Sequence, residues 1–314
     1  MPILKLKPAC KDYLWGGSKL REEYNIPADL DPLAEAWVLS CHPDGPSVVE
    51  NGPDAGLTLP EYIEKHGRKV LGKNCARFED FPILTKFIDA KGDLSIQVHP
   101  DNAYALEHEG QYGKTEMWYV LEAEPGAFLY YGFKHPIAKA EYKERIENNT
   151  LTEVLNAAQV KKGDVFFIPA GTLHAICKGI VIAEIQQNSN VTYRVYDYGR
   201  LGADGKPRQL HVAQALEVTQ CVPPQPRDFG GHLAACEYFT ADAVQGSAEG
   251  ICDEDSFTSL LITDGEGSLA CGGETLAVRK GDSLFLPAGS GEWKLNGSAS
   301  ALVCWIENHG EVKA

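Results

Sequence analysis

VKKGDVFFIPAGTLHA (residues 160–175) occurs a second time, near the C-terminus, as VRKGDSLFLPAGSGEW (residues 278–293). The two segments are identical at eight of their sixteen positions. Each combines a Lys-Gly-Asp turn, a short apolar run typical of a buried strand, and a Pro-Ala-Gly turn that leads into another strand. The spacing between the copies is too long for a solenoid and fits two copies of one β-domain. We therefore predict a mainly β fold of two related β-sandwich or β-barrel modules.

The segment between the two copies contains the predicted domain boundary. Residues 220–232 (QCVPPQPRDFGGH) are rich in Pro and Gly, which is typical of a linker. We expect an N-terminal module over residues 1–219, a linker over 220–234 and a C-terminal module over 235–314. A chain of 314 residues can bury a sizeable core in this arrangement.

Several segments of the first module carry helix signals. They lie at residues 58–67, at 101–110, at 136–160, which predicts two short helices, and at 208–219. Thr58 and Glu61 have the spacing of a capping box, as do Thr150 and Glu153 at the start of the second helix within 136–160. Asp101 is placed as the N-cap of its segment. We therefore expect short helical insertions in a β-rich module.

The composition limits the class of partner. The formal net charge is −15 and the isoelectric point is about 5.0, which argues against nucleic acid or an anionic membrane as a partner. A small anionic substrate stays compatible, because it needs only a few local cations. No apolar run is long enough to span a membrane, and the N-terminus lacks the apolar core of a secretion signal. The nine cysteines form no CxxC pair, so we expect reduced thiols and a cytoplasmic location.

Four polar residues in strand-like segments form the candidate metal site. Gln97 and His99 lie two residues apart in SIQVHP, so their side chains project from the same face of a strand. Glu116 opens the next strand-like run after a polar excursion, and His174 follows the Pro-Ala-Gly turn of the repeat. The pair in QVH alone is more often the polar outer face of a strand. Together the four residues offer two nitrogen and two oxygen donors, which suits zinc or another borderline divalent ion.

The second copy of the repeat lacks these donors. Glu292 stands where the first copy has His174, and nothing before it is similar to QVHP. We therefore expect one metal ion per chain, bound by the N-terminal module, and a structural C-terminal module.

Three cations interrupt strand-like segments elsewhere in the first module. Arg194 lies in TYRVYDYGR (residues 192–200), where an unpaired guanidinium would be costly if buried. It can form a salt bridge across the sheet, for example to Glu184, or face an anionic substrate or transition state. Lys86 and Lys114 are the other two cations, and the sequence leaves open whether the three converge.

The sequence resembles the type I mannose-6-phosphate isomerases in their short bacterial form, which are zinc-dependent cupins. The resemblance covers nearly the whole chain and rests on YLWGG, AEAWVLSCHPDG, FPILTKFIDAKGDLSIQVHPDN, GKTEMWYVL, IPAGTLHAI, TYRVYDYGR and GKPRQLHVAQAL. QVHPDN, GKTE and the TYRVYDYGR segment are specific to this family, whereas the hairpin of IPAGTLHAI is shared by cupins in general.

The resemblance implies a fold, a reaction and roles for individual residues. The fold would be two cupin modules, each a jelly-roll β-sandwich or barrel, the second degenerate and without metal. The reaction would interconvert mannose 6-phosphate and fructose 6-phosphate, so the partner would be a small phosphorylated sugar. The residues that match the zinc ligands of the family are Gln97, His99, Glu116 and His174. Arg194 matches the catalytic arginine, and Lys86 and Lys114 match lysines that face the substrate. The helical insert 101–110 would cover the site.

An aldose–ketose isomerase must remove the proton at C2 and return one to C1 through an enediol. Lys114 is one candidate for the proton shuttle and Glu184 is the other, and the sequence does not choose between them. The phosphate-binding residues are also unassigned, although Lys86 is a candidate. The alternatives to this function are a non-catalytic sugar-binding cupin and another metal-dependent cupin enzyme, such as an iron oxygenase, which would be expected to use more histidine ligands.

Overall fold

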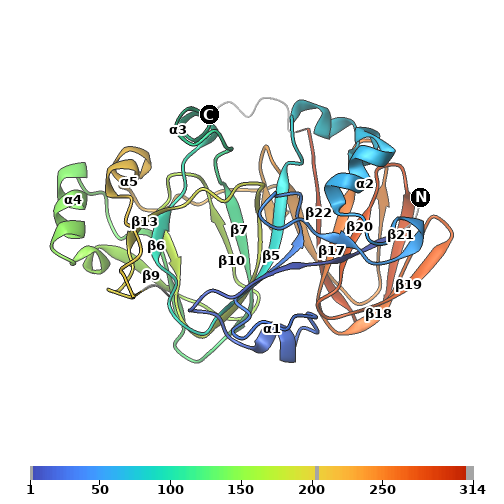
Figure 1. Ribbon diagram of the computed structural model, residues 1–314, viewed down its shortest axis with the longest axis horizontal. Helices are drawn as coiled ribbons and strands as arrows, with labels where there is room; N and C mark the ends of the chain where they lie inside the picture. Colours follow the sequence, from blue (N-terminus) through green and yellow to red (C-terminus); the bar gives the residue numbers. More distant parts are fainter. Residues whose placement is uncertain (1–2, 202–204, 309–314) are drawn as a thin grey trace. The chain divides into compact units, whose positions relative to one another are not determined.

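The computed structural model describes residues 3–201 and 205–308, and the predicted mainly β fold is confirmed (Figure 1). The described residues form two compact units. The first contains residues 3–12, 18–87 and 228–308, and the second contains residues 13–17, 88–201 and 205–227. Strand β5 (Ile83–Ala90) carries the chain from the first unit into the second.

The second unit is a sandwich of antiparallel sheets. One sheet has the strand order β13-β6-β11-β8-β9, and β10, β7 and β12 are consecutive neighbours in the other. Figure 1 shows β13, β6 and β9 in one layer and β7 and β10 in the next. The elements of this unit are β6 (Ile96–Val98), α3 (Asn102–His108), β7 (Glu116–Ala123), β8 (Phe128–Phe133), α4 (Lys139–Glu147), β9 (Leu155–Gln159), β10 (Val165–Ile168), β11 (His174–Ile176), β12 (Ile180–Gln187), β13 (Tyr193–Tyr196) and α5 (Val212–Val218).

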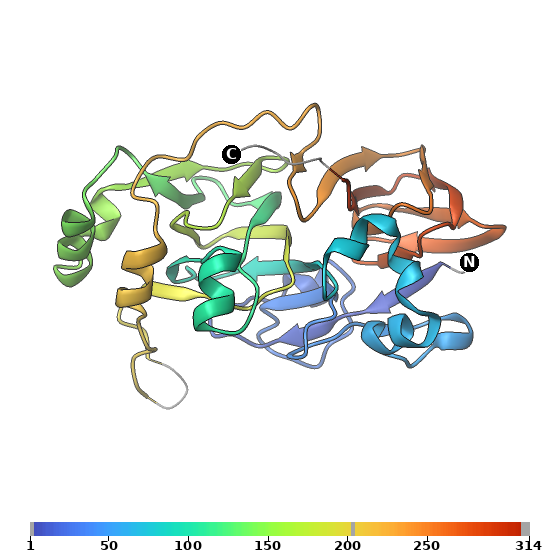
Figure 2. The same cartoon turned by 90° about the horizontal axis from the view of Figure 1, so that it is seen from above.

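Helices α4 and α5 pack on the outer face of the sheet that contains β6, and they lie side by side (Figure 1, Figure 2). Ile96 and Val98 of β6 belong to the hydrophobic core beneath them. Tyr142 of α4 and Ala215 of α5 belong to the same core. Because successive side chains of a strand alternate between faces, Gln97 projects to the inner face of the sandwich.

The first unit holds a second sandwich. Its larger sheet has the order β14-β15-β22-β17-β20-β1-β4 and its smaller one the order β16-β21-β18-β19. Apolar residues of both sheets, such as Leu260, Leu284 and Leu295, form one core. The strands are β1 (Leu4–Lys7), β4 (Val48–Val49), β14 (Ala234–Ala235), β15 (Thr240–Gln245), β16 (Ala248–Cys252), β17 (Thr258–Asp264), β18 (Glu266–Cys271), β19 (Glu274–Arg279), β20 (Ser283–Leu286), β21 (Gly291–Gly297) and β22 (Ser300–Trp305). The unit also contains β2 (Ala9–Lys11), α1 (Lys19–Glu22), β3 (Glu35–Leu39) and α2 (Leu59–His66).

The repeated segment has the same structure in both units. Its apolar runs form β10 in one unit and β20 in the other. Gly163 and Gly281 precede them with φ angles of 90° and 96°, a left-handed conformation that glycine tolerates. In each turn the aspartate side chain accepts a backbone N–H hydrogen bond, at 2.9 Å for Asp164 and 3.0 Å for Asp282. The chain therefore uses one turn-and-strand unit twice.

Most of the predicted helices are present. Helix α2 begins with the predicted capping box of Thr58 and Glu61. Helix α3 has Asp101 as its N-cap, and its side chain accepts a hydrogen bond from the N–H of Tyr104 at 2.9 Å. Helix α5 lies within the predicted segment 208–219.

The second helix predicted within 136–160 is wrong. A short 3-10 turn (Leu151–Glu153) follows α4, and no side chain caps it. The residues after this turn form β9 instead, and Leu155 pairs with Phe133 of β8. Tertiary pairing with a neighbouring strand thus overrides the local helix signal.

The two units do not follow the expected boundaries near residues 219 and 235. Residues 3–12 and 18–87 fold with the C-terminal copy of the repeat, because β1 pairs with β20 in the register Leu4↔Phe285. Strand β4 then pairs with β1. An N-terminal strand that completes a distant sheet leaves no signal in the repeat itself.

All nine cysteines are free thiols. In the described part of the chain, no helix combines the length and the apolar character that a membrane span requires.

Candidate metal centre

Three of the predicted site residues form a row on one sheet of the second unit. The strand register places Gln97 opposite His174 on one side and opposite Arg194 on the other. Directly opposed residues of antiparallel strands project from the same face. The row therefore faces the inside of the sandwich, toward the start of β7.

The excursion of the chain over residues 100–114 closes on itself. The backbone N–H of Lys114 donates a hydrogen bond to the carbonyl of Pro100 at 3.0 Å. Gly113 permits this closure, because a Cβ atom there would lie 2.3 to 2.6 Å from backbone atoms of residues 100–102. The chain thus returns beside the point where it left the sheet, which keeps the predicted ligands on either side of the excursion together.

His99, Glu116 and His174 converge into a group that can hold a metal ion, with ligand atoms within 4.8 Å of one another. Oε1 of Glu116 lies 3.4 Å from Nε2 of His174, and Oε2 lies 3.7 Å from Nε2 of His99. Donor atoms that each bind one tetrahedral ion at about 2 Å stand about 3.3 Å apart. All three side chains are buried. The spacing and the burial therefore fit a single ion.

Backbone carbonyls fix the orientation of both imidazoles. Nδ1 of His99 donates to the carbonyl of Val191 at 2.7 Å, and Nδ1 of His174 donates to the carbonyl of Thr172 at 2.8 Å. A carbonyl can only accept, so Nδ1 carries the proton and Nε2 keeps its lone pair for a metal. Burial, opposed by the hydrogen bond to Thr172, lowers the pKa of His174 to about 4. The imidazole is thus neutral at pH 7, as a metal ligand must be.

The side chain of Gln97 also lies beside the group of His99, Glu116 and His174. Its Nε2 lies 3.5 Å from Nε2 of His174. The amide oxygen is bound to the same carbon atom, so a half-turn of the amide group presents an oxygen donor there. The structure therefore brings together all four residues of the predicted donor set.

Lys114 connects this group to Glu184. Its Nζ lies 2.5 Å from Oε2 of Glu116, 3.3 Å from Nε2 of His99 and 3.5 Å from Oε1 of Glu184. The other oxygen of Glu184 accepts a hydrogen bond from Nε1 of Trp118 at 2.8 Å. Both Lys114 and Glu184 are buried. The two residues between which the sequence does not choose are therefore neighbours.

Arg194 is held beside the row by hydrogen bonds. Its Nε donates to Oγ of Ser95 at 3.2 Å, and its Nη1 donates to the carbonyl of Gln209 at 3.1 Å. Its backbone N–H donates to Nδ1 of His211 at 3.2 Å. The salt bridge to Glu184, which is the alternative role expected for Arg194, is not formed among residues 3–201 and 205–308.

A second charged group, which the sequence does not single out, follows β13. Asp197 is buried and pairs with Arg200 at 2.6 Å and with Arg208 at 2.5 Å. Burial raises the pKa of Asp197, but the hydrogen bonds from Arg208 and Arg200 outweigh it, so that the pKa lies below its ordinary value. Two guanidinium groups around one carboxylate leave a net positive charge. Burial lowers the pKa of Arg194, and the charges of Arg208 and Arg200 lower it further.

Lys86 lies in the first unit, on the part of β5 before the chain enters the second. It is buried, with Nζ 3.6 Å from Oε2 of Glu35 and 5.2 Å from the centre of the Trp37 ring. Its role toward a substrate stays a prediction.

The C-terminal counterpart of His174 differs more than the alignment indicates. Glu292 occupies the aligned position, but it is exposed. The preceding Gly291 has a φ angle of 87°, whereas Leu173 in the first copy is not left-handed. With Gly291 in this conformation, the two faces of β21 are exchanged relative to the alignment. Trp293 rather than Glu292 therefore faces the core. Within the described residues, the group in the second unit is the one cluster of His, Cys, Asp and Glu with metal-ligand spacing.

A β-sandwich with a buried His–Glu–His group inside it defines a metal-binding cupin. Two family models match the chain. The catalytic domain of type I phosphomannose isomerase matches residues 3–126, and the cupin domain of mannose-6-phosphate isomerase matches residues 231–306. Mannose-6-phosphate isomerase of Bacillus subtilis is 40% identical over 315 residues, which cover 96% of this chain and 98% of that protein. This chain belongs to the family of type I mannose-6-phosphate isomerases.

Solved structures agree with this assignment. A crystal structure of mannose 6-phosphate isomerase from Bacillus subtilis superposes with a TM-score of 0.89 at 36% identity, covering 97% of this chain and 99% of that one. A structure described as zinc-bound mannose 6-phosphate isomerase superposes with a TM-score of 0.78 at 19% identity, covering 98% and 100%, and at that identity it supports the fold alone.

Replacing His174 by alanine should remove the metal, because the site loses one of its two imidazole nitrogens. Glu292→Ala is the matched control, since Glu292 is aligned with His174 but exposed. Metal analysis of purified protein should find about one equivalent per chain in the wild type and in the control. Equal loss of metal from both variants, or two equivalents in the wild type, would contradict a single site in the first copy.

Gly113→Ala should weaken metal retention without changing a ligand, because its Cβ would push apart the closed ends of the excursion. Gly110→Ala in the same excursion is the control, as nothing lies within 4 Å of its Cβ, although its φ angle of 64° costs some stability. Competition with a chelator should show metal affinity about tenfold lower or more for Gly113→Ala only. Unchanged affinity in Gly113→Ala would show that the closure does not position the ligands.

Proposed function

We propose that this protein is a zinc-dependent aldose–ketose isomerase that interconverts mannose 6-phosphate and fructose 6-phosphate. The observation that carries the proposal is the buried group of His99, Glu116 and His174. Lys114 and Glu184 lie beside it, where a substrate bound at the metal would need a proton shuttle. The names of relatives that match over nearly the full chain support the same substrate here.

Zinc is the ion that the donor set fits best. Two imidazoles, one carboxylate and one amide oxygen suit a borderline divalent ion. We assign the four ligand positions to Gln97, His99, Glu116 and His174, with one ion per chain. When bound, zinc supplies a Lewis acid that polarises the sugar carbonyl and a template that orients the adjacent hydroxyl groups.

We assign proton movement to Lys114 and Glu184 as a coupled pair. The reaction takes a proton from C2 and returns one to C1, which needs a group that accepts and then donates. Nζ of Lys114 and Oε1 of Glu184 are 3.5 Å apart, so a proton held by one can pass to the other. The hydrogen bond from Trp118 fixes the other oxygen of Glu184, and Oε1 is the oxygen on the side of Lys114.

Arg194 is suited to stabilise the negative charge of the enediolate. It stands in the same row as Gln97 and His174, on the face that contains the metal group. Its hydrogen bonds to Ser95 and Gln209 hold the guanidinium in place before the reaction. A preorganised cation of this kind acts where charge develops, and removing such a donor typically costs about 3 kcal/mol of transition-state stabilisation.

The phosphate group needs further cations, and two sets are candidates. Arg200 and Arg208 surround Asp197 and keep a net positive charge near Arg194, and guanidinium groups match the geometry of phosphate oxygens. Lys86 of the first unit is the other candidate. We also propose that the insert 101–110 covers the bound sugar and that the enzyme works in the cytoplasm, where its nine free thiols stay reduced.

The purified protein should produce fructose 6-phosphate from mannose 6-phosphate in a coupled assay. Exhaustive chelation should remove nearly all turnover, and one equivalent of zinc should restore it. Full activity after chelation would overturn the metal dependence. Binding of the sugar to metal-loaded protein without turnover would identify a non-catalytic sugar-binding cupin and overturn the proposed enzyme.

Arg194→Ala should keep its zinc and its fold but lower kcat by about a hundredfold or more. The Michaelis constant should change far less, because the interaction is strongest in the transition state. Arg194→Lys, which keeps the charge but loses the planar group, should recover part of the rate. Steady-state kinetics and a thermal melt of both variants make the measurement.

The same experiment separates other roles of Arg194. A steep rise in the Michaelis constant with little change in kcat would assign the residue to the phosphate instead. A lower melting temperature with normal kcat would make it structural. A stable Arg194→Ala enzyme with unchanged kinetics would contradict any role in the reaction.

A further inference from the structure

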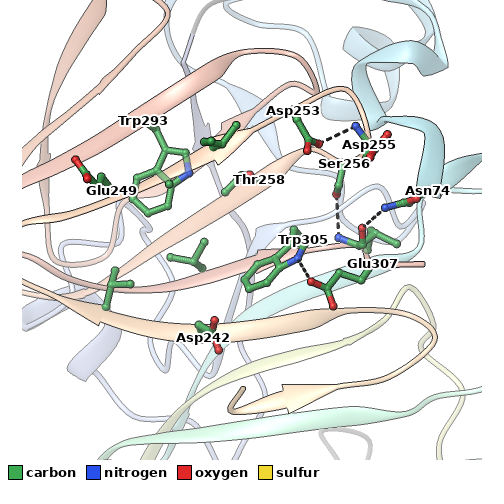
Figure 3. Close-up of a pocket in the computed structure, with 15 residues that line it drawn as sticks. Asn74, Asp242, Glu249, Asp253, Asp255, Ser256, Thr258, Trp293, Trp305 and Glu307 are labelled. Carbon is green, nitrogen blue, oxygen red and sulfur yellow. Dashed lines mark hydrogen bonds between the residues drawn. The ribbon is translucent and has the colours of Figure 1, made fainter. Parts of the chain in front are cut away.

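The C-terminal copy of the repeat contains a half-open cavity of about 470 Å³ in the first unit, and its lining includes the exposed Ile251. This volume lies in the range of small-molecule sites. Figure 3 shows its lining side chains, with the indole rings of Trp293 and Trp305 on two sides of the space and Thr258 between them. The sequence predicts only a structural role for this copy and therefore assigns no ligand to the cavity.

The cavity occupies the place that corresponds to the metal group of the other copy. In the first copy Glu116 pairs with Ile168 at the end of the repeated strand and with Gln186 on its other side. In the second copy Thr258 pairs in the same way with Leu286 and with Trp305. Thr258 therefore occupies the position that Glu116 has in the first copy, and Trp305 occupies the position of Gln186.

The side chain of Trp293 faces the core of the first unit and lines the cavity together with Thr258. The flat contact with β16 depends on Gly250, because a Cβ there would lie 2.6 Å from the indole ring. Trp293 is only 4% exposed, and no residue in the described ranges accepts a hydrogen bond from its Nε1. Figure 3 shows this nitrogen turned toward Thr258. The donor therefore faces the space of the cavity, where a ligand can supply the acceptor.

The charge of the lining selects against anions. Five of the lining residues are carboxylates and none is Lys or Arg. The carboxylates are Asp242, Glu249, Asp253, Asp255 and Glu307. Some have partners outside the lining, such as Lys294 at 3.1 Å from Glu249 and Lys73 at 3.4 Å from Asp255. The cavity still offers acceptors in excess, and a phosphate group inside it would meet like charge without a compensating cation.

We propose that this cavity binds an uncharged hexose. The C–H face of a sugar ring packs against indole planes, which have a large apolar surface and a negative face. Sugar hydroxyl groups donate to carboxylates and accept from an indole N–H, so one neutral polyol satisfies both kinds of group. A simple organic cation would suit the acids and the rings but would leave the N–H of Trp293 without an acceptor. The inference does not depend on the isomerase activity of the other copy.

The five tryptophans of the chain allow a direct test, because each gives one indole N–H resonance in a ¹⁵N correlation spectrum. Trp293→Phe and Trp305→Phe assign the two cavity signals. Titration with D-mannose should shift both signals along a saturable curve. D-mannose 6-phosphate should leave them in place, because the acidic lining repels it.

Two variants show where the sugar binds. Trp305→Ala should weaken the D-mannose-dependent shift of the Trp293 signal by about tenfold or more, since it removes a stacking surface. Gly250→Ala should do the same while keeping both rings, because it displaces Trp293. Glu292→Ala, exposed on the same strand as Trp293 and outside the lining, should bind as the wild type does.

Some outcomes would overturn the proposal. They are the absence of a saturable shift at Trp293 in the wild type, equal shifts with the phosphorylated sugar, and binding that survives both cavity variants in folded protein.

Discussion

The buried carboxylate of Glu116 is the constraint on which the site depends. A fully buried carboxylate costs several kcal/mol unless cations or donors surround it. Here the ammonium of Lys114 supplies one positive charge, and the Nε2 lone pairs of the two imidazoles beside the carboxylate leave the rest of the compensation to a bound metal ion. The closed excursion returns Glu116 to His99, and the Pro-Ala-Gly turn places His174. Backbone carbonyls then fix both rings. Each of these local features makes sense as a means to compensate one negative charge inside a β-sandwich.

The same frame carries different side chains in its second copy, and one glycine contributes to the difference. The turn, the strand after it and the aspartate hydrogen bond are alike in both copies. Gly291 then turns β21 over by one position, since a strand shifted by one residue exchanges its two faces. The polar residue at the aligned position becomes exposed and a tryptophan enters the core. An alignment of residue types finds the loss of the histidine, but only the backbone shows what replaces it.

The sequence can predict that the proposed metal ligands converge, because they lie in strands or next to fixed turns. Strand periodicity puts Gln97 and His99 on one face, and the repeat locates His174. The sequence does not reveal Arg208 beside Asp197, because both residues lie outside helices and strands, where no periodicity applies. The capping-box spacing of Thr150 and Glu153 fails for another reason, since β9 gains more from pairing with β8 than a short helix would provide. The N-terminal strand that joins β20 likewise follows from long-range pairing, which local patterns do not contain.

The net charge of −15 describes neither the surroundings of Arg194 nor the cavity of the other copy. Around Arg194 the cations Arg200 and Arg208 exceed the one carboxylate between them, so a phosphorylated sugar meets an attractive potential. The cavity of the other copy has carboxylates and no Lys or Arg in its lining, so the same phosphate meets repulsion. Both places can use hydroxyl groups, but they differ in charge and in their metal-binding groups. If both bind sugars, the phosphate is therefore what directs a hexose to the metal-binding copy, and its absence is what admits one to the copy without metal.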